Sequence, residues 1–353
     1  MLLTVLSVAY PLTPVGPDAV GGAEQILSSM DSAMVRAGHL SLVIACEGSQ
    51  TEGELLATQG WNRGLNDDVR RWGQRQHKIA IEQALERYRV DLIHMHSLDW
   101  HAYLPASDVP LLATLHLPLS WYPEHVLGMH RPRTFLNCVS RTQRAMCKTP
   151  HLPAFVVENG VPLARLRGRA HRKRDYVIGL GRICPEKGYH FALDACRRRG
   201  MPMILAGEIF PYKAHLDYFE HEIRPRLDGQ RRFVGPVGLD RKRRLLVGAR
   251  CLLVPSLVEE TSSLAAMEAL ACGTPVIAFS TGALPEIVEQ GRTGFVVRDV
   301  DEMTEALGCV DEIDPEECRR SATERFSGDR MTRDYLALYD LILARVQCGG
   351  PPV

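Results

Sequence analysis

Short apolar runs rich in β-branched residues alternate along the chain with longer segments whose apolar residues recur at helical spacing. In the first half, the strand-like runs are LLTVLSVA, LSLVIAC, DLIHMH, PLLATLH, FLNCVS and AFVVEN. The helix-like segments between them cover residues 22–37, about 68–89, and 141–147. Strands that alternate with amphipathic helices are typical of βαβ units, so the pattern predicts a parallel sheet covered by helices.

The same alternation begins again near residue 175. The second series of strand-like runs is DYVIGLG, MPMILAG, RRFVG, RCLLVPS, TPVIAF and TGFVV, and residues 330–346 predict a final amphipathic helix. Between the two series, residues 161–175 are rich in arginine and lack periodicity, as is typical of a solvated linker. We therefore expect two Rossmann-like, doubly wound α/β domains facing across a cleft, residues 1–164 and 165–325, followed by a helical segment, 326–353.

The bulk composition excludes several classes of function. A chain of 353 residues, 45% hydrophobic and 24% charged, has the size and composition of about two globular domains. Its 42 basic and 42 acidic residues cancel, so no global charge attracts it to nucleic acid or acidic lipid. The ten cysteines form no CxxC pair and no Cys/His metal spacing, which favours a reducing compartment over a disulfide framework.

The first apolar segment, MLLTVLSVAYPLTP, is short and lacks a positively charged start. Pro11 and Pro14 interrupt it, so it is interpreted as a buried strand and not as a signal peptide. No run approaches the ~20 apolar residues of a membrane-spanning helix. We therefore expect a cytoplasmic protein without a transmembrane segment, with peripheral membrane contact and oligomeric state left open.

Candidate chemistry is sought at strand-to-helix turns, where open α/β sheets bind their ligands. In GLGRICPEKG, Gly181 ends a strand, and Arg182 and Lys187 flank a loop that leads into a helix. Two cations beside a helix N-terminus match a pyrophosphate, because free N–H groups and the helix dipole also favour anions there. An ordinary basic surface loop explains the same residues equally well.

The segment EETSSLAAMEALACGTP places one carboxylate, Glu260, in a loop and another, Glu268, on the following helix. Gly273 and Pro275 form a helix stop signal. The neighbours of Glu268 are apolar, which argues against an ordinary solvated acid at this position. We expect both carboxylates to contact one ligand lying across the helix N-terminus. Ser262 or Ser263 is expected to be the N-cap of this helix. The backbone amides expected near the phosphates of the ligand are those of Thr261, Ser262, Ser263 and Leu264.

The N-terminal half carries weaker signals. Gly21 and Gly22 at a helix start allow close backbone approach to a phosphate or sugar, although a flexible turn explains them too. His116 ends a strand and is expected to point into the cleft. Aromatic residues suited to stacking on an acceptor, or equally to core packing, are Trp100, Tyr103, Trp121 and Tyr122.

Two patterns that resemble metal sites are not assigned to one. His94 and His96 share one face of a strand, but no third ligand follows at an obvious spacing. Asp299 and Asp301 form a DxD pattern, a metal–nucleotide motif in some enzymes, but a helix follows immediately. Asp301 is therefore interpreted as an N-cap.

Taken in order, these motifs resemble the retaining glycosyltransferases of the GT-B fold, in the large family-4 group. The similarity covers nearly the whole chain and is strongest over residues 176–307. The matching runs there are GLGRICPEKG, LAGE, FVGPV, VPSLVEETSSLAAMEALACGTPVIAF and GRTGFVV. The N-terminal runs GGAEQ, RAGH, LIHMH, TLH, VSRTQ and ENGVP also correspond. The resemblance implies retaining transfer of a sugar from a nucleotide-diphosphate sugar to an acceptor hydroxyl, without a metal or other cofactor and without a protein nucleophile.

The resemblance also implies roles for individual residues. Glu260 would contact hydroxyls of the donor sugar, and Glu268 would hold the hydroxyls of the ribose. Arg182 and Lys187 would stabilise the negative charge of the leaving diphosphate. His116 would lie near the donor sugar, Gly21 and Gly22 over the donor phosphates, and the last helix would cross back to the first domain.

One departure from the family pattern concerns the donor. Thr261, Ser262 and Ser263 stand where the family often has Pro-Phe-Gly, which suggests a different donor preference. The acceptor, the donor sugar and the base remain open. Two alternatives are also kept: a sugar-nucleotide epimerase or sugar phosphorylase on the same fold, and a non-catalytic nucleotide-sugar-binding subunit.

Overall fold

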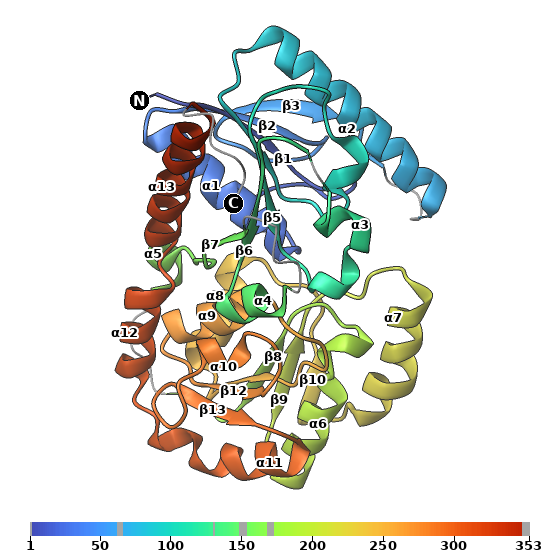
Figure 1. Ribbon diagram of the computed structural model, residues 1–353. Coiled ribbons are helices and arrows are strands. Elements are labelled where there is room, and N and C mark those ends of the chain that lie inside the picture. Colours follow the sequence, from blue (N-terminus) through green and yellow to red (C-terminus); the bar gives the residue numbers. More distant parts are fainter. Residues whose placement is uncertain (1, 62–65, 130, 148–153, 168–172, 348–353) are drawn as a thin grey trace. The chain divides into compact units, whose positions relative to one another are not determined.

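The computed structural model of the chain describes residues 2–61, 66–129, 131–147, 154–167 and 173–347. The chain folds into two compact units, one of Met1–Asn159 with Asp329–Val353 and one of Gly160–Gly328. Each unit contains one parallel sheet with helices packed against it (Figure 1). The expected α/β class with two doubly wound parallel sheets is confirmed.

The sheet of the first unit has seven parallel strands in the order β3-β2-β1-β4-β5-β6-β7. The strands are β1 (Thr4–Val8), β2 (Leu40–Cys46), β3 (Glu54–Thr58), β4 (Leu92–Met95), β5 (Leu111–Leu115), β6 (Thr134–Cys138) and β7 (Ala154–Val156). Its α-helices are α1 (Gly22–Arg36), α2 (Asp67–Arg87), α3 (Glu124–Leu127), α4 (Arg141–Met146) and α13 (Gly328–Gln347). The strand order reverses between β1 and β4.

The sheet of the second unit has six parallel strands in the order β10-β9-β8-β11-β12-β13. They are β8 (Val177–Leu180), β9 (Met203–Ala206), β10 (Arg231–Phe233), β11 (Leu252–Val254), β12 (Val276–Phe279) and β13 (Gly294–Val297). The α-helices are α5 (Leu163–Leu166), α6 (Tyr189–Arg198), α7 (Lys213–Tyr218), α8 (Leu239–Gly248), α9 (Leu264–Ala271), α10 (Leu284–Ile287), α11 (Val300–Cys309) and α12 (Pro315–Arg325). Here the order reverses between β8 and β11.

The second sheet is buried on both faces, and successive residues of its strands enter different cores. Leu252 and Val276 pack into the core that also holds residues of α9. The next residue of each strand, Leu253 and Ile277, packs into the core that holds residues of α6 and α11. This alternation follows from the two-residue period of a strand and explains why the sequence runs are almost wholly apolar.

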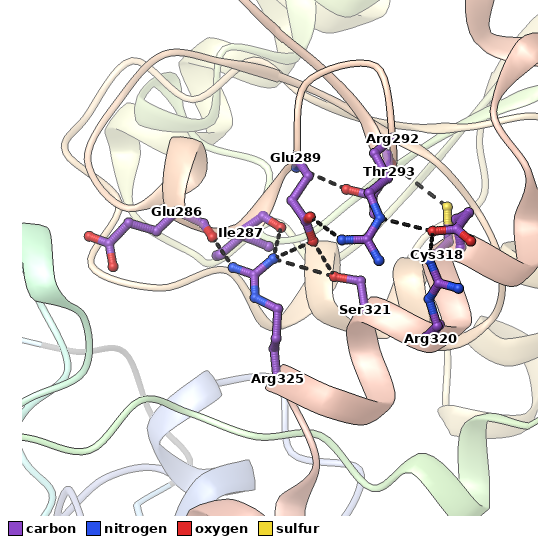
Figure 2. Close-up of polar contacts among 10 residues, drawn as sticks. Glu286, Ile287, Glu289, Arg292, Thr293, Cys318, Arg320, Ser321 and Arg325 are labelled. Atoms are coloured by element: carbon purple, nitrogen blue, oxygen red, sulfur yellow. Dashed lines mark hydrogen bonds and ion pairs between the residues drawn. The ribbon is translucent and has the colours of Figure 1, made fainter.

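A polar network attaches α12 to the segment between α10 and β13. Figure 2 shows the Glu289 carboxylate between the guanidinium groups of Arg292 and Arg325, at 2.6 and 2.8 Å, with the Ser321 hydroxyl at 2.7 Å. Burial alone would raise the pKa of Glu289, but the hydrogen bonds from Ser321, Arg292 and Arg325 hold it below its ordinary value. The network therefore keeps an ionised carboxylate in place at neutral pH.

The last helix of the described chain, α13, is hydrogen-bonded to the sheet of the first unit. The Tyr339 hydroxyl lies 2.6 Å from Nδ1 of His94, and the Asn137 side-chain amide donates to the Tyr335 hydroxyl at 3.0 Å. Both tyrosines are fully buried. These bonds satisfy polar groups that strands β4 and β6 bury inside the unit, where an unpaired group is costly.

Two expectations about local structure need correction. The edge strand β3 was not expected, because its sequence, ELLAT, is short and half-exposed and has little of the apolar character of the central strands. Asp301 is not the N-cap of α11. The cap is Asp299, whose carboxylate accepts from the backbone N–H groups of Asp301 and Glu302 at 2.9 Å.

In the described part of the chain, no helix has both the length and the apolar character needed to cross a membrane.

Candidate functional site

The loops after β8 and β11 meet at the point where the strand order of the second sheet reverses. The backbone N–H of Leu257, in the second loop, donates to the carbonyl of Glu186 in the first at 2.8 Å. Gly188 closes the first loop with φ +62°, and a Cβ there would overlap the carbonyl of Pro255. The close approach of the two loops therefore requires glycine at this position.

Lys187 and Glu260 meet across these two loops. The Lys187 Nζ lies 2.5 Å from Oε1 of Glu260, and the two side chains are 25% and 10% exposed. The Ser256 hydroxyl donates to the same Oε1 at 2.5 Å. Both of these donors bind Oε1, so neither of them occupies Oε2 of Glu260. Ser256 was missed by the sequence analysis, although its place two residues after the end of β11 is a signal for a polar site residue.

The backbone of Glu260 is held from its other side by the segment after β12. The Ala283 N–H donates to the Glu260 carbonyl at 2.7 Å. Gly282 has φ +53°, and a Cβ there would overlap the backbone N and O of Glu260. The position of the Glu260 loop therefore depends on a glycine 22 residues further along the chain.

We expect Gly282→Ala to destabilise the protein by more than the roughly 1–2 kcal/mol that a left-handed backbone costs a non-glycine residue. The excess arises because the new methyl group overlaps the Glu260 backbone. Gly291→Ala is the matched control, because Gly291 has φ +72° and a methyl group added there would have nothing within 4 Å. Urea unfolding of the two variants measures the difference, and equal losses would show that the contact with Glu260 does not matter.

Helix α9 begins directly after the Glu260 loop. The side chain of Ser263 caps it by accepting from the Ala266 N–H at 3.4 Å, which decides between the two expected caps. The N–H groups of Leu264 and Ala265, in the first turn, have no acceptor within the helix. Thr261 is buried, and the Ser262 hydroxyl is buried without a partner in the described part of the chain. Donors and a hydroxyl thus gather where an anionic or sugar ligand is expected.

Glu268 is buried on α9 and pairs with a lysine of the neighbouring helix α8. The Lys242 Nζ lies 2.5 Å from Oε1 of Glu268, and their side chains are 12% and 5% exposed. Burial raises the pKa of Glu268, and Lys242 partly offsets that effect. The sequence did not identify Lys242, because it lies in a run of four basic residues, RKRR, that would all face solvent in an ordinary surface helix.

Arg182 lies in the first loop, with its guanidinium 5.6 Å from the centre of the Phe210 ring, a cation–π distance. Gly181, just before it, has φ +149°, and a Cβ there would lie 2.7 Å from the Tyr189 hydroxyl. The backbone at Gly181 is therefore packed closely between neighbours. Together, Arg182, Lys187 and the start of α9 place cations and N–H donors on the two loops at the strand-order reversal.

In the first unit, Gly21 is the N-cap of α1 and Gly22 its first residue. The buried Glu24 carboxylate lies over Gly21, where a Cβ would overlap it. His116 directly follows β5, and its Nε2 lies 3.1 Å from Nδ1 of His96. Burial lowers the pKa of His116 to about 4, so the imidazole is neutral at pH 7.

The four aromatic candidates differ in exposure. Trp100 and Tyr103 are completely buried, and Tyr122 is 5% exposed. The Tyr103 hydroxyl donates to Asp99 at 3.1 Å inside the core. Trp121 is 41% exposed, so it is the candidate that offers a ring surface to a ligand in this structure.

Both ring nitrogens of His94 have hydrogen-bond partners, which leaves neither of them for a metal ion. Its Nε2 lies 2.8 Å from the Thr114 hydroxyl, and its Nδ1 contacts the Tyr339 hydroxyl.

Two protein families match the chain. Residues 20–166 match the family described as Glycosyltransferase Family 4, and residues 174–310 match Glycosyl transferases group 1. Among curated proteins, the glycogen synthase of Mycobacterium tuberculosis is 26% identical over 95% of this chain and 91% of that protein. Both units of the chain thus have counterparts in sugar-transferring enzymes.

Solved structures are similar over the whole chain. The sucrose-phosphate synthase of Thermosynechococcus elongatus has a TM-score of 0.80 at 18% identity, covering 97% of this chain and 99% of that one. HepE of Anabaena, solved in complex with UDP-glucose, has a TM-score of 0.75 at 17% identity, covering 96% and 99%. At these identities the similarity establishes the GT-B fold.

Proposed function

The chain belongs to glycosyltransferase family 4, the retaining hexosyltransferases that take a sugar from a nucleotide sugar, and we propose that the loops after β8 and β11 bind its donor. The observation that carries this proposal is the Lys187–Glu260 pair at the strand-order reversal, beside the start of α9. A cation for the diphosphate and a carboxylate for the sugar then stand next to each other. The acceptor is a hydroxyl group of an unidentified molecule.

Arg182 and Lys187 bind the donor diphosphate. A diphosphate leaving group gains negative charge as the bond to the sugar breaks, so cations placed there stabilise the transition state more than the ground state. The N–H groups of Leu264 and Ala265 and the dipole of α9 add to this stabilisation. Because protein cations occupy these positions, we expect transfer without a divalent metal ion on the diphosphate.

Glu260 accepts hydrogen bonds from hydroxyls of the donor sugar, and its Oε2 is the oxygen available for this contact. Glu268 accepts from the ribose hydroxyls, and the ion pair with Lys242 opposes the rise in its pKa that burial causes. Thr261, Ser262 and Ser263 border the donor, and the unpaired Ser262 hydroxyl is a further contact for sugar or phosphate. The family often has Pro-Phe-Gly at these three positions, so we propose that these side chains determine the donor preference.

In the first unit, His116 is neutral at pH 7 and is proposed to contact sugar hydroxyls, and Gly21 and Gly22, at the start of α1, are proposed to contact phosphate. A neutral imidazole both donates and accepts hydrogen bonds, which suits contact with sugar hydroxyls. Trp121 is the aromatic side chain best placed to stack on an acceptor, because its ring is exposed. The cysteines in the described residues are all free thiols, which supports the expected cytoplasmic location.

A donor panel tests the proposal. Thermal unfolding is measured with UDP-, ADP- and GDP-linked hexoses, and the donor at 100 times its Kd stabilises by about 2.7 kcal/mol. Slow hydrolysis of that donor without acceptor should then release a sugar with the donor's anomeric configuration, read by NMR. Inversion, an epimerised nucleotide sugar, or phosphate-dependent release of a sugar phosphate would each contradict the proposal. The absence of any stabilising nucleotide sugar would contradict donor binding itself.

A further inference from the structure

Three side chains of metal-binding type gather beside the first loop of the second unit. Cys184 and Glu186 belong to that loop, and His215 lies on α7. One ligand atom from each residue lies within 4.8 Å of the others. The third ligand comes from a different element, so the cluster depends on the fold and not on a local sequence motif.

Two polar atoms of the cluster lack hydrogen-bond partners. Nδ1 of His215 and Oε2 of Glu186 are buried and accept or donate no hydrogen bond in the described part of the chain. The His215 residue is only 9% exposed. An unpaired buried polar atom costs roughly 1–3 kcal/mol in this setting, so two of them in one cluster point to a missing ligand.

The ring of His215 is fixed by its aromatic neighbours. Phe210 stacks on it with centroids 6.2 Å apart, and Tyr212 meets it edge-on at 5.2 Å. Hydrophobic packing around a metal-binding imidazole sets its orientation and limits access of solvent. The two aromatic contacts thus restrict the His215 ring to an orientation beside the loop.

We propose that Cys184, Glu186 and His215 bind one zinc ion, with a fourth position open to water. A thiolate, an imidazole and a carboxylate are the ligands that zinc accepts, whereas magnesium and calcium prefer oxygen alone. An ion equidistant from three atoms at the 4.8 Å limit lies about 2.8 Å from each, against ideal zinc distances of about 2.0–2.3 Å. Small side-chain rotations therefore complete the coordination.

The charges at the site balance when zinc binds. A cysteine binds zinc as its thiolate, so the thiol proton of Cys184 goes to solvent when zinc binds. The thiolate and the Glu186 carboxylate then neutralise the two positive charges of the ion. The nearby Lys187 is paired with Glu260, which limits its repulsion of the ion.

The ion joins α7 to the loop that carries Arg182 and Lys187. Three of its ligands are protein groups and the fourth is water, so no part of the proposed donor is needed to hold it. We assign it a structural role in holding this loop, distinct from a metal bound to the diphosphate.

Cobalt titration of the chelator-treated full chain tests the site, because cobalt reports thiolate ligation by a charge-transfer band. We expect one equivalent to give this band together with strong tetrahedral absorption, both removed by zinc. Cys184→Ser should abolish the charge-transfer band, and His215→Gln should weaken cobalt binding at least tenfold. The matched controls are Cys309→Ser, an exposed thiol, and His221→Gln, an exposed histidine on the segment after α7. Both should bind as the unmodified protein does.

A featureless spectrum of the unmodified protein would overturn the proposal without reference to any variant. So would retention of the band in Cys184→Ser, since it would place the ion on another thiol. Calorimetry adds an independent readout: zinc binding at pH 7 should release about one proton, measured from the dependence of the heat on buffer ionisation. Release of no proton would contradict ligation by Cys184.

Discussion

Lys187→Ala is expected to lower kcat by about 10²–10³, the usual cost of removing one group that stabilises developing negative charge. The reason is the role proposed for Lys187, which is to supply a positive charge to the leaving diphosphate from a position 2.5 Å from the Glu260 carboxylate. Initial rates over a range of donor concentrations separate kcat from KM. A loss confined to KM would show that Lys187 binds the donor equally in the ground and transition states.

Lys213→Ala is the matched control for this experiment. Lys213 lies on the neighbouring helix α7 with an 88% exposed side chain, so its removal changes the net charge equally without touching the site. Glu260→Ala should lose activity to a similar degree, because it removes the proposed contact with the donor sugar and also the partner of Lys187. Full activity in both Lys187→Ala and Glu260→Ala would refute the roles given to this pair. The cobalt spectrum should persist in Lys187→Ala, so a failure of the donor assignment is distinguishable from a failure of the zinc site.

Lys242→Met is expected to destabilise the protein by about 3–5 kcal/mol, the range for breaking a buried ion pair by removing one partner. Glu268 then stays buried on α9 without a compensating charge. Replacing both partners, Lys242→Met with Glu268→Gln, should recover much of the loss, because no charge is left unpaired. Urea unfolding of the single and double variants measures the coupling between the two side chains.

The loss in Lys242→Met should depend on pH. Burial raises the pKa of Glu268 in the folded chain, and removal of Lys242 raises it further. A carboxyl whose folded pKa exceeds its unfolded value, near 4.3, favours the folded state most at low pH and loses that contribution as pH rises. The difference between variant and unmodified protein should therefore grow as the pH rises above about 4. A constant difference would indicate that packing, and not charge, is what Lys242 contributes.

The sequence predicted the fold well because its local signals agree with the tertiary structure. Apolar runs of the central strands are buried on both faces, so β8, β11 and β12 stand out in the sequence. The edge strand β3 does not stand out in the sequence, because only Thr58 of its five residues is buried and its sequence contains no long apolar run. The end of α9 could also be predicted from the sequence, because Gly273 has φ +74° and only glycine adopts that backbone conformation easily.

Two contacts of the candidate site were not expected from the sequence, and they have a common cause. Lys242 contacts Glu268, and Gly282 contacts the backbone of Glu260, from segments that the sequence does not relate to them. The zinc cluster escaped a search for metal-binding spacing for the same reason, since His215 lies 31 residues beyond Cys184 (215 − 184 = 31). Spacing rules detect ligands that share one element, and these residues come from several.

The hydrogen bonds of α13 have a consequence for folding during synthesis. His94 and Tyr339 are 245 residues apart, and the whole of the second unit lies between them. The second unit is continuous in sequence, so its contacts can form before the end of the chain leaves the ribosome. The first unit must keep His94 and Asn137 without their tyrosine partners until α13 emerges, and closing that long connection costs entropy. The N-terminal unit should therefore be the later of the two to reach its final stability, although it is made first.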